Sequence, residues 1–344
     1  MIAAICKELI LRKDYLSERI DTIYFGGGTP SIIETSHISL LLEKIAGIYN
    51  IKADAEITLE ANPEDMNKST AKALFNLGIN RISLGVQSFD DKVLDGLNRA
   101  HAKTEAIEAI HHLQDSGFSN ITIDLIYGIP GQNNEVWQAN LAQAMKLDIP
   151  HLSCYALTIE ENTAFGHWLK SGLLKQVPEI KYEQDYNTMC QYLAKEGYLH
   201  YEVSSFARPG FESRHNSSYW QQKAYIGLGP GAHSFNQRSR QYNISHNAKY
   251  IKSINNGELP FNEEILSQTQ LLNEYILTGL RTNGGIDLQR IEQEFGIDLY
   301  KKHSKFIARC VEDNLAIIEN NTFILSDKAL ILADSIIIEL MIDK

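Results

Sequence analysis

Polar residues that could bind a ligand recur along the first half of the chain, each near the end of an apolar run. The sharpest signal is Gly26-Gly27-Gly28-Thr29, directly after the run TIYF. Three glycines let backbone approach a ligand closely. The segment is neither a P-loop nor a GxGxxG motif, because no Lys-Ser/Thr pair follows and the spacing differs. The other candidates, in chain order, are Glu60, Gln87, Arg99 and Asp124.

Two of these candidates are carboxylates with different surroundings. Glu60 ends the run EITLE, and a carboxylate at a strand end suits the hydroxyls of a ribose. Asp124 stands between Ile123 and Leu125, so it requires a hydrogen-bond partner. Taken singly, each candidate also has a structural interpretation. The glycines could form a tight turn, Asp124 could be a buried structural carboxylate, and Glu60, Gln87 and Arg99 could be solvated side chains on the surface.

The elements that must position these residues follow an alternating pattern. The predicted strands are 21–27, 55–62, 81–89, 120–128 and 151–159, and the predicted helices between them are 36–49, 69–78, 104–117 and 134–147. This alternation predicts an α/β fold with a parallel sheet and right-handed crossovers. The candidates lie near the carboxyl ends of the strands, the edge that carries the site in barrels, so we expect a partial (β/α) barrel. The chain begins on a helix, which implies that the first barrel strand is missing.

The pattern changes after residue 160. A predicted helix at 181–197 precedes strand-like segments at 198–207 and 224–235. From residue 265 the order is helix, helix-turn-helix, hairpin and closing helix, with Asn320-Asn321 at the hairpin turn. That order predicts a small, winged-helix-like α+β domain. The predicted division is a barrel with its extension (1–235), a linker (236–264) and a C-terminal domain (265–344).

Charge and composition exclude several classes of protein. The 344 residues carry a formal net charge of −11, which argues against a nucleic-acid partner because phosphate binding requires a basic face. The winged-helix-like region is itself acidic. No stretch approaches the roughly 20 apolar residues of a membrane span, and no signal peptide is recognisable. The four cysteines have no CxxC spacing, so we expect neither a disulfide framework nor a metal knuckle, and we expect a cytoplasmic protein.

The motifs GGGTP, LEANP, RISLGVQSF, NRAH and IDLIYGIPGQ occur in order along these β-α units. This joint pattern resembles the S-adenosylmethionine (SAM) binding barrel of the coproporphyrinogen III oxidase (HemN) and HemW families of radical SAM proteins. The resemblance implies that the backbone of Gly26, Gly27, Gly28 and Thr29 contacts the methionine amino group of SAM, and that Glu60 binds its ribose. It further implies contacts at the positions that HemN uses for a second SAM. These positions are Gln87, Arg99, Asp124 and Ala156.

The chain departs from this family at its N-terminus. The family opens with a strand and a CxxxCxxC loop, whose three thiolates hold a [4Fe–4S] cluster that binds SAM. Here Met1 falls within the helix expected after that loop, and the cysteine spacing is absent. The chain is therefore not expected to hold the cluster or to cleave SAM. Without the first strand, the next strand should form an unpaired edge of the sheet. A truncated sequence and a natural cluster-free relative both explain the departure.

The segment RHNSSYW resembles a motif of HemW-type haem chaperones. Imidazole is a good ligand for haem iron, and aromatic rings can stack on a porphyrin face. We therefore predict His215 as the haem-iron ligand, with Tyr219 and Trp220 as haem contacts. A histidine beside aromatic residues can also be structural. The candidates for a second iron ligand are Cys154, His200 and His233, the last within the HemW-like segment GLGPGAHS.

Three functions follow from these patterns. The favoured one, because of RHNSSYW, is a haem chaperone that binds haem, SAM and, in its full-length form, a [4Fe–4S] cluster, and delivers haem to acceptor proteins, with a homodimer compatible with the family. The second is an oxygen-independent coproporphyrinogen III oxidase of porphyrin biosynthesis, in which the cofactor would carry the chemistry. The third is a cluster-free binding module. Whether the chain is an enzyme stays open.

Overall fold

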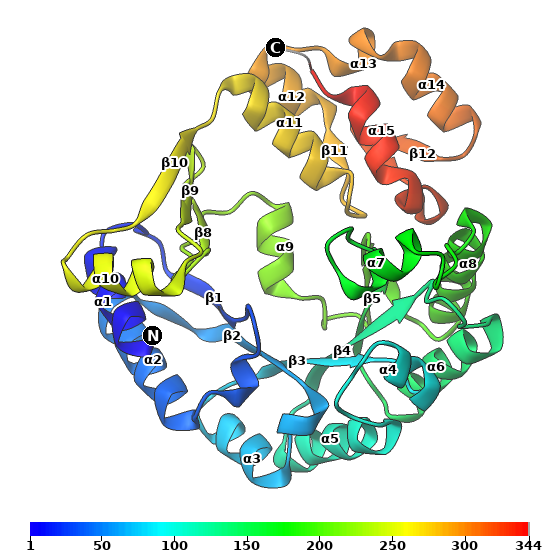
Figure 1. The fold of residues 1–344 in the computed structure, drawn as a ribbon. Coiled ribbons are helices and arrows are strands. Elements are labelled where there is room, and N and C mark those ends of the chain that lie inside the picture. Colours follow the sequence, from blue (N-terminus) through cyan, green and yellow to red (C-terminus); the bar gives the residue numbers. More distant parts are fainter. Residues whose placement is uncertain (343–344) are drawn as a thin grey trace.

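The computed structural model describes residues 1–342, and its main feature is a curved sheet of seven strands with helices along the outer side (Figure 1). The strand order is β1-β2-β3-β4-β5-β7-β6; the first five are parallel, and the last two join antiparallel. The bounds are β1 Ile20–Phe25, β2 Ile51–Ala61, β3 Arg81–Gln87, β4 Asn120–Tyr127, β5 His151–Ala156, β6 Leu199–Glu202 and β7 Ser205–Ala207. The predicted partial barrel is confirmed, and β1 forms an edge of the sheet.

The outer face of the sheet is apolar and is covered by helices. Ile82, Leu84, Ile121 and Ile123 on this face are fully buried. Because side chains alternate along a strand, the neighbouring polar positions point to the concave face. The helices between and after the parallel strands are α2 Thr35–Ile48, α3 Lys68–Asn76, α4 Asp91–Gly96, α5 Lys103–Ser116, α6 Asn134–Lys146, α7 Ala164–Lys170 and α8 Glu179–Lys195.

Helix α9, Arg214–Trp220, lies on the concave side of the sheet instead of covering its outer face (Figure 1). It packs on β1 and also contacts the C-terminal helix α11. The buried carboxylate of Glu56 on β2 accepts hydrogen bonds from the backbone amides of Arg214 (3.0 Å) and His215 (2.9 Å). A carboxylate at these amides satisfies groups that have no partner within the helix and favours its dipole. This contact brings the RHNSSYW segment onto the sheet.

Residues 236–264, which the sequence predicts as a linker, are folded. They contain β9 Ser239–Asn243, α10 Asn247–Asn255 and most of β10 Phe261–Ile265, and β8 His233–Phe235 completes a three-stranded antiparallel sheet. The N-terminal helix α1, Ile2–Leu11, packs against α10. The segment is polar but ordered, because buried side chains of α1 bond to it. The predicted strand at 224–235 is reduced to β8, since the glycines Gly229 and Gly231 adopt positive φ.

The C-terminal unit has the predicted helix, helix-turn-helix and hairpin order. Its elements are α11 Gln268–Gly279, β11 Ile286–Asp287, α12 Leu288–Phe295, α13 Leu299–Lys302, α14 Ser304–Glu312, β12 Ala316–Glu319, β13 Thr322–Leu325 and α15 Ala333–Leu340. Asn320 and Asn321 both have positive φ, as the tight hairpin turn requires. Its apolar side chains belong to the same core cluster as those of the barrel. Within residues 1–342, no helix has the length and hydropathy to span a membrane.

Candidate functional site

The glycine loop and Glu60 form one site at the carboxyl ends of β1 and β2. Glu60 accepts a hydrogen bond from the Tyr24 hydroxyl (2.8 Å) and another from the amide of Gly27 (3.2 Å). A Cβ at Gly26 would lie 2.6 Å from the Tyr24 ring, and Gly27 and Gly28 have φ of +78° and +75°. Only glycine fits this path. Gly26, Gly27 and Gly28 are exposed, so their backbone groups are open to a ligand.

Gln87 and Arg99 lie at the same edge of the sheet, on and after β3. Arg99 donates to the side-chain oxygen of Asn62 (2.9 Å) and to the carbonyl of Gly85 (3.3 Å). Gln87 adopts φ of +65°, and its amide nitrogen lies 3.0 Å from the position of a Cβ at Gly85. The structure thus brings Gln87 and Arg99 together around Gly85, while Ala156 is exposed at the end of β5.

Asp124 is a half-buried carboxylate of this site. Burial raises its pKa to about 7, against the opposing charge of Arg81, while Glu60 adds to the rise and the side chains of Ser153 and Ser83 oppose it. A carboxyl group with such a pKa exchanges a proton near neutral pH. Asp124 is in register with Ser153 on β5, so a serine hydroxyl is the candidate for its expected hydrogen-bond partner.

His215 points from α9 toward β1. Its Nδ1 lies 2.8 Å from the hydroxyl of Thr22, and its ring stacks on Tyr24 with centroids 4.6 Å apart and planes inclined by 18°. Burial, aided by the charge of Arg81, lowers the pKa of His215 to about 4. The imidazole is therefore neutral at physiological pH, the form that binds a metal. Its Nε2 forms no hydrogen bond with any of the described residues.

The aromatic residues of the same helix meet His215 differently. Tyr219 packs edge-on against its ring at 4.9 Å and contacts Tyr225 in turn. The indole Nε1 of Trp220 is buried and has no hydrogen-bond partner in the described part of the chain. Tyr219 thus contacts His215, the predicted haem-iron ligand, whereas no such contact is seen for Trp220 among the residues that the structure describes.

The candidates for a second iron ligand lie in three different places. Cys154 is buried in the core on the outer face of β5, the opposite face from His215. His200 stacks on Phe206 and lies 3.6 Å from the carboxylate of Asp327. Of these three, only His233 is exposed, at the start of β8 beside Tyr242.

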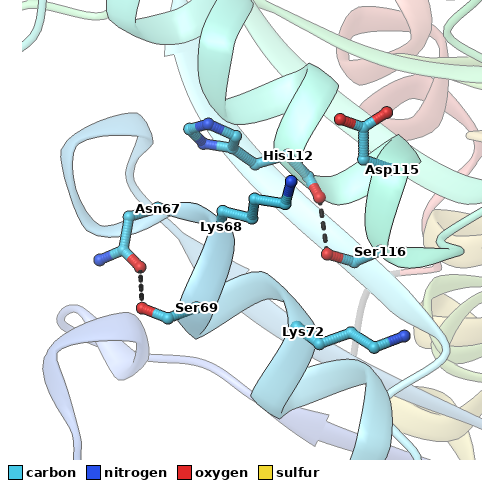
Figure 2. A pocket seen from close by; sticks show the side chains of 7 residues that line it. All are labelled: Asn67, Lys68, Ser69, Lys72, His112, Asp115 and Ser116. Atoms are coloured by element: carbon cyan, nitrogen blue, oxygen red, sulfur yellow. Dashed lines mark hydrogen bonds between the residues drawn. The ribbon is translucent and has the colours of Figure 1, made fainter.

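A hollow on the outer surface, between α3 and α5, lies away from all of these residues. Figure 2 shows its lining, which includes Lys68, Lys72, His112 and Asp115. His112 bonds to the carbonyl of Met66 at 3.0 Å, which gives it a structural role. Because α3 and α5 cover the convex face, this hollow is separated from the concave site by the sheet.

Two protein-family models match parts of this chain. Residues 6–142 match the model of the radical SAM superfamily, and residues 266–332 match the HemN C-terminal domain. The haem chaperone HemW of Lactococcus lactis is 37% identical over 298 residues, which cover 87% of this chain and 78% of that protein. HemW of Bacillus subtilis is 32% identical, covering 81% and 74% of the two chains.

The chain belongs to the HemW family of radical SAM proteins.

The fold of this HemW-family chain is also that of a solved structure. Coproporphyrinogen III oxidase (HemN) from Escherichia coli superimposes with a TM-score of 0.85, covering 98% of this chain and 82% of that one. The sequence identity is 21%, so this likeness shows the fold alone. The resemblance inferred from the sequence motifs is confirmed at the level of family and fold.

Radical SAM proteins are expected to use a [4Fe–4S] cluster, but the cysteines of this HemW-family chain do not form one site. Cys6, Cys154, Cys190 and Cys310 are free and lie on α1, β5, α8 and α14. Among residues 1–342, no three His, Cys, Asp or Glu side chains gather as a metal site. These residues therefore do not fit the cluster, and none of the contacts described above depends on it.

Several residues of the concave face are absent from the candidates chosen by sequence. Thr22, Tyr24, Glu56 and Arg81 all face His215 or its helix, yet none is the last residue of its strand. Strand alternation places them on the polar face. It does not show that a helix more than a hundred residues further along the chain fills that face.

Proposed function

We propose that this protein binds haem through His215 on the concave face of its barrel and passes the haem to an acceptor protein in the cytoplasm. The observation that carries the proposal is the state of His215: a neutral imidazole, fixed at Nδ1 by Thr22, with Nε2 free of hydrogen bonds to described residues. A hydrogen bond at one ring nitrogen orients the other toward a metal. Relatives named haem chaperones support the same activity.

The residues around His215 fit an iron-bound porphyrin. Tyr219 packs against the imidazole, and Trp220, the next residue of α9, has an unpartnered Nε1 that could donate to a polar group of a ligand. Bound haem would supply an iron centre, and Nε2 of His215 would hold it. The residues of this chain would orient that imidazole and cover the porphyrin. His233, exposed on β8, is the candidate for a second ligand.

SAM is proposed to bind at the neighbouring edge of the sheet. There, Glu60 and the exposed backbone of the glycine loop face solvent, with Gln87, Arg99, Asp124 and Ala156 at the ends of the next strands. For residues 1–342 the proposal is that SAM is bound; its cleavage is not assigned to them. The homodimer, and the domain division at residues 235 and 265, stay predictions.

Titration of ferric haem into the purified protein tests this function. We expect a saturable shift of the Soret band in the wild type, and a binding constant weaker by about tenfold or more, with an altered Soret maximum, in His215→Ala. His111→Ala, which removes an exposed imidazole on α5, is the matched control and should behave as wild type. An unchanged Soret band and affinity in His215→Ala would rule out the assignment.

A further inference from the structure

Arg81 begins β3 in the middle of the concave face. Its backbone is in register with Thr58 on β2 and Asn120 on β4, and Thr58 is in register with Tyr24 on β1. Ile82, the next residue, is fully buried on the outer face, so Arg81 points to the concave side. Four side chains therefore form one row across four strands, and one end of the row, Tyr24, stacks on His215.

This row holds polar atoms that have no partner. Arg81 is 2% exposed, and its Nε has no hydrogen-bond partner among residues 1–342. The same is true of the hydroxyl of Thr58 and the side-chain oxygen of Asn120. No carboxylate of the described chain lies within 4.0 Å of the Arg81 guanidinium. A guanidinium is always charged, and burying it unpaired is costly, so its usual partner is an anion.

Two carboxylates on the same face already have other partners. Glu56 accepts from the amides of α9, and Glu60 accepts from Tyr24 and Gly27. Asp124 lies on this face too, and the charge of Arg81 acts on it, but its carboxylate is not within 4.0 Å of the guanidinium. The concave face, as far as the described residues form it, therefore contains a buried cation and a row of unpartnered polar atoms, with no carboxylate within 4.0 Å of that cation.

We propose that Arg81, with Thr58 and Asn120 beside it, binds a carboxylate of the ligand held on the concave face. The Arg81 guanidinium and the Thr58 hydroxyl would donate hydrogen bonds to this carboxylate. The Asn120 side chain would do the same after its amide group is rotated by half a turn, which exchanges its oxygen for its NH₂. The inference rests on the proposed function, because it assigns the anionic group of that ligand. Haem carries two propionates and SAM carries one amino-acid carboxylate; both are the same chemistry. Arg81 and Tyr24 share one row, so a ligand bound at His215 reaches this subsite.

Two pairs of ligands distinguish these sources. The first pair is ferric haem and its dimethyl ester, which blocks both propionates, presented in the same detergent. The second is SAM and decarboxylated SAM, which lacks only the carboxylate. Each is titrated into the wild type and into Arg81→Met, which keeps an unbranched side chain without the charge. Lys72→Met on the outer helix α3 (Figure 2) is the matched control for loss of a positive charge.

We expect the wild type and Lys72→Met to prefer the carboxylate-bearing member of one pair by about tenfold or more, and Arg81→Met to lose that preference. If Arg81→Met loses the preference in the haem pair, Arg81 binds a haem propionate. If it loses the preference in the SAM pair, Arg81 binds the amino-acid carboxylate of SAM. A purely structural Arg81 would weaken both members of a pair equally. An unchanged ratio in both pairs would therefore overturn the inference.

If circular dichroism shows that Arg81→Met does not fold, the affinity ratios of the wild type alone test the inference. Equal affinities within both pairs, or no binding in either pair, would then overturn the inference. If neither haem nor its ester binds while SAM does, the proposed haem function fails, and the SAM pair still tests Arg81. If haem binds and the ratios do not change, the function stands and only the Arg81 subsite is lost.

Discussion

His215 is held by residues that lie far from it in the sequence. Thr22 bonds to its Nδ1, Tyr24 stacks on its ring, and Glu56 accepts from its amide. Burial lowers its pKa from the ordinary 6.5 to about 4, so the native protein keeps the imidazole neutral over a pH range in which the unfolded chain takes up a proton. Between these two pKa values, the unfolded state therefore gains stability as the pH falls.

This shift predicts a pH dependence of folding. As the pH falls from about 6.5 to about 4, the free energy of unfolding should decrease by up to about 3 kcal/mol through His215 alone. Urea denaturation at about pH 7 and about pH 5, without haem, should show about 2 kcal/mol of this loss. His215→Gln should lose less stability over this interval than the wild type. His151, whose pKa burial also lowers, is common to both proteins and cancels in the comparison.

If His215→Gln and the wild type lose the same free energy over this interval, the imidazole is not protected from protonation in the native state. An imidazole with the ordinary pKa of about 6.5 is still mostly neutral at about pH 7, so the haem titration remains the test of the haem proposal.

Among the helices, α1 is fixed in position by a buried carboxylate. Glu8 is 0% exposed and accepts from the Tyr250 hydroxyl (2.5 Å), the Gly229 amide (2.8 Å) and the Asn243 side chain (2.7 Å). Arg12, one turn later, forms a salt bridge with Glu8 at 3.0 Å. These contacts attach the helix that precedes β1 to the sheet of β8, β9 and β10.

Glu8→Ala should therefore destabilise the protein by about 3–5 kcal/mol, because it leaves Arg12 buried and unpaired. Hydrogen exchange should lose protection first in α1 and α10, and urea denaturation gives the total effect. Lys7→Ala is the matched control: Lys7 is exposed and bonds only to Asn255 among the described residues, so a change within about 0.5 kcal/mol is expected. Equal effects of the two variants would contradict a structural role for Glu8.

Across the whole molecule, the barrel and the C-terminal unit share one core. The buried residues Leu272 and Ile276 of α11 belong to the same cluster as Trp137 and Leu141 of α6. The hydroxyl of Tyr186 on α8 also donates to the carbonyl of Asp327 at 2.8 Å. A shared apolar core couples the unfolding of the parts that build it.

A cavity in the C-terminal unit should therefore destabilise the barrel. Ile276→Ala, at a fully buried position, should cost about 2–5 kcal/mol and lower the urea midpoint of tryptophan fluorescence, although all three tryptophans lie outside the C-terminal unit. Val311→Ala, at an exposed position of α14, should leave the midpoint nearly unchanged. A normal fluorescence midpoint in Ile276→Ala, with loss of helix signal at lower urea, would show two independent units.

Local patterns in the sequence were enough to predict the elements of the barrel and the edge at which its motifs meet. Apolar periodicity and turn residues act over short distances, so the five parallel strands, their helices and the Asn320-Asn321 turn could all be predicted. The carboxyl ends of parallel strands share one edge, which is why the glycine loop, Glu60 and Arg99 lie near one another.

What fills the concave face, in contrast, depends on the tertiary structure. Alternation places Thr22, Glu56 and Arg81 on that face, but their partners come from α9 or from no described residue at all. The order of residues 236–264 likewise depends on Glu8 and Arg12, more than 200 positions earlier in the chain. Such contacts form because the curved sheet and α1 bring distant segments together, and no local pattern of residue types records that geometry.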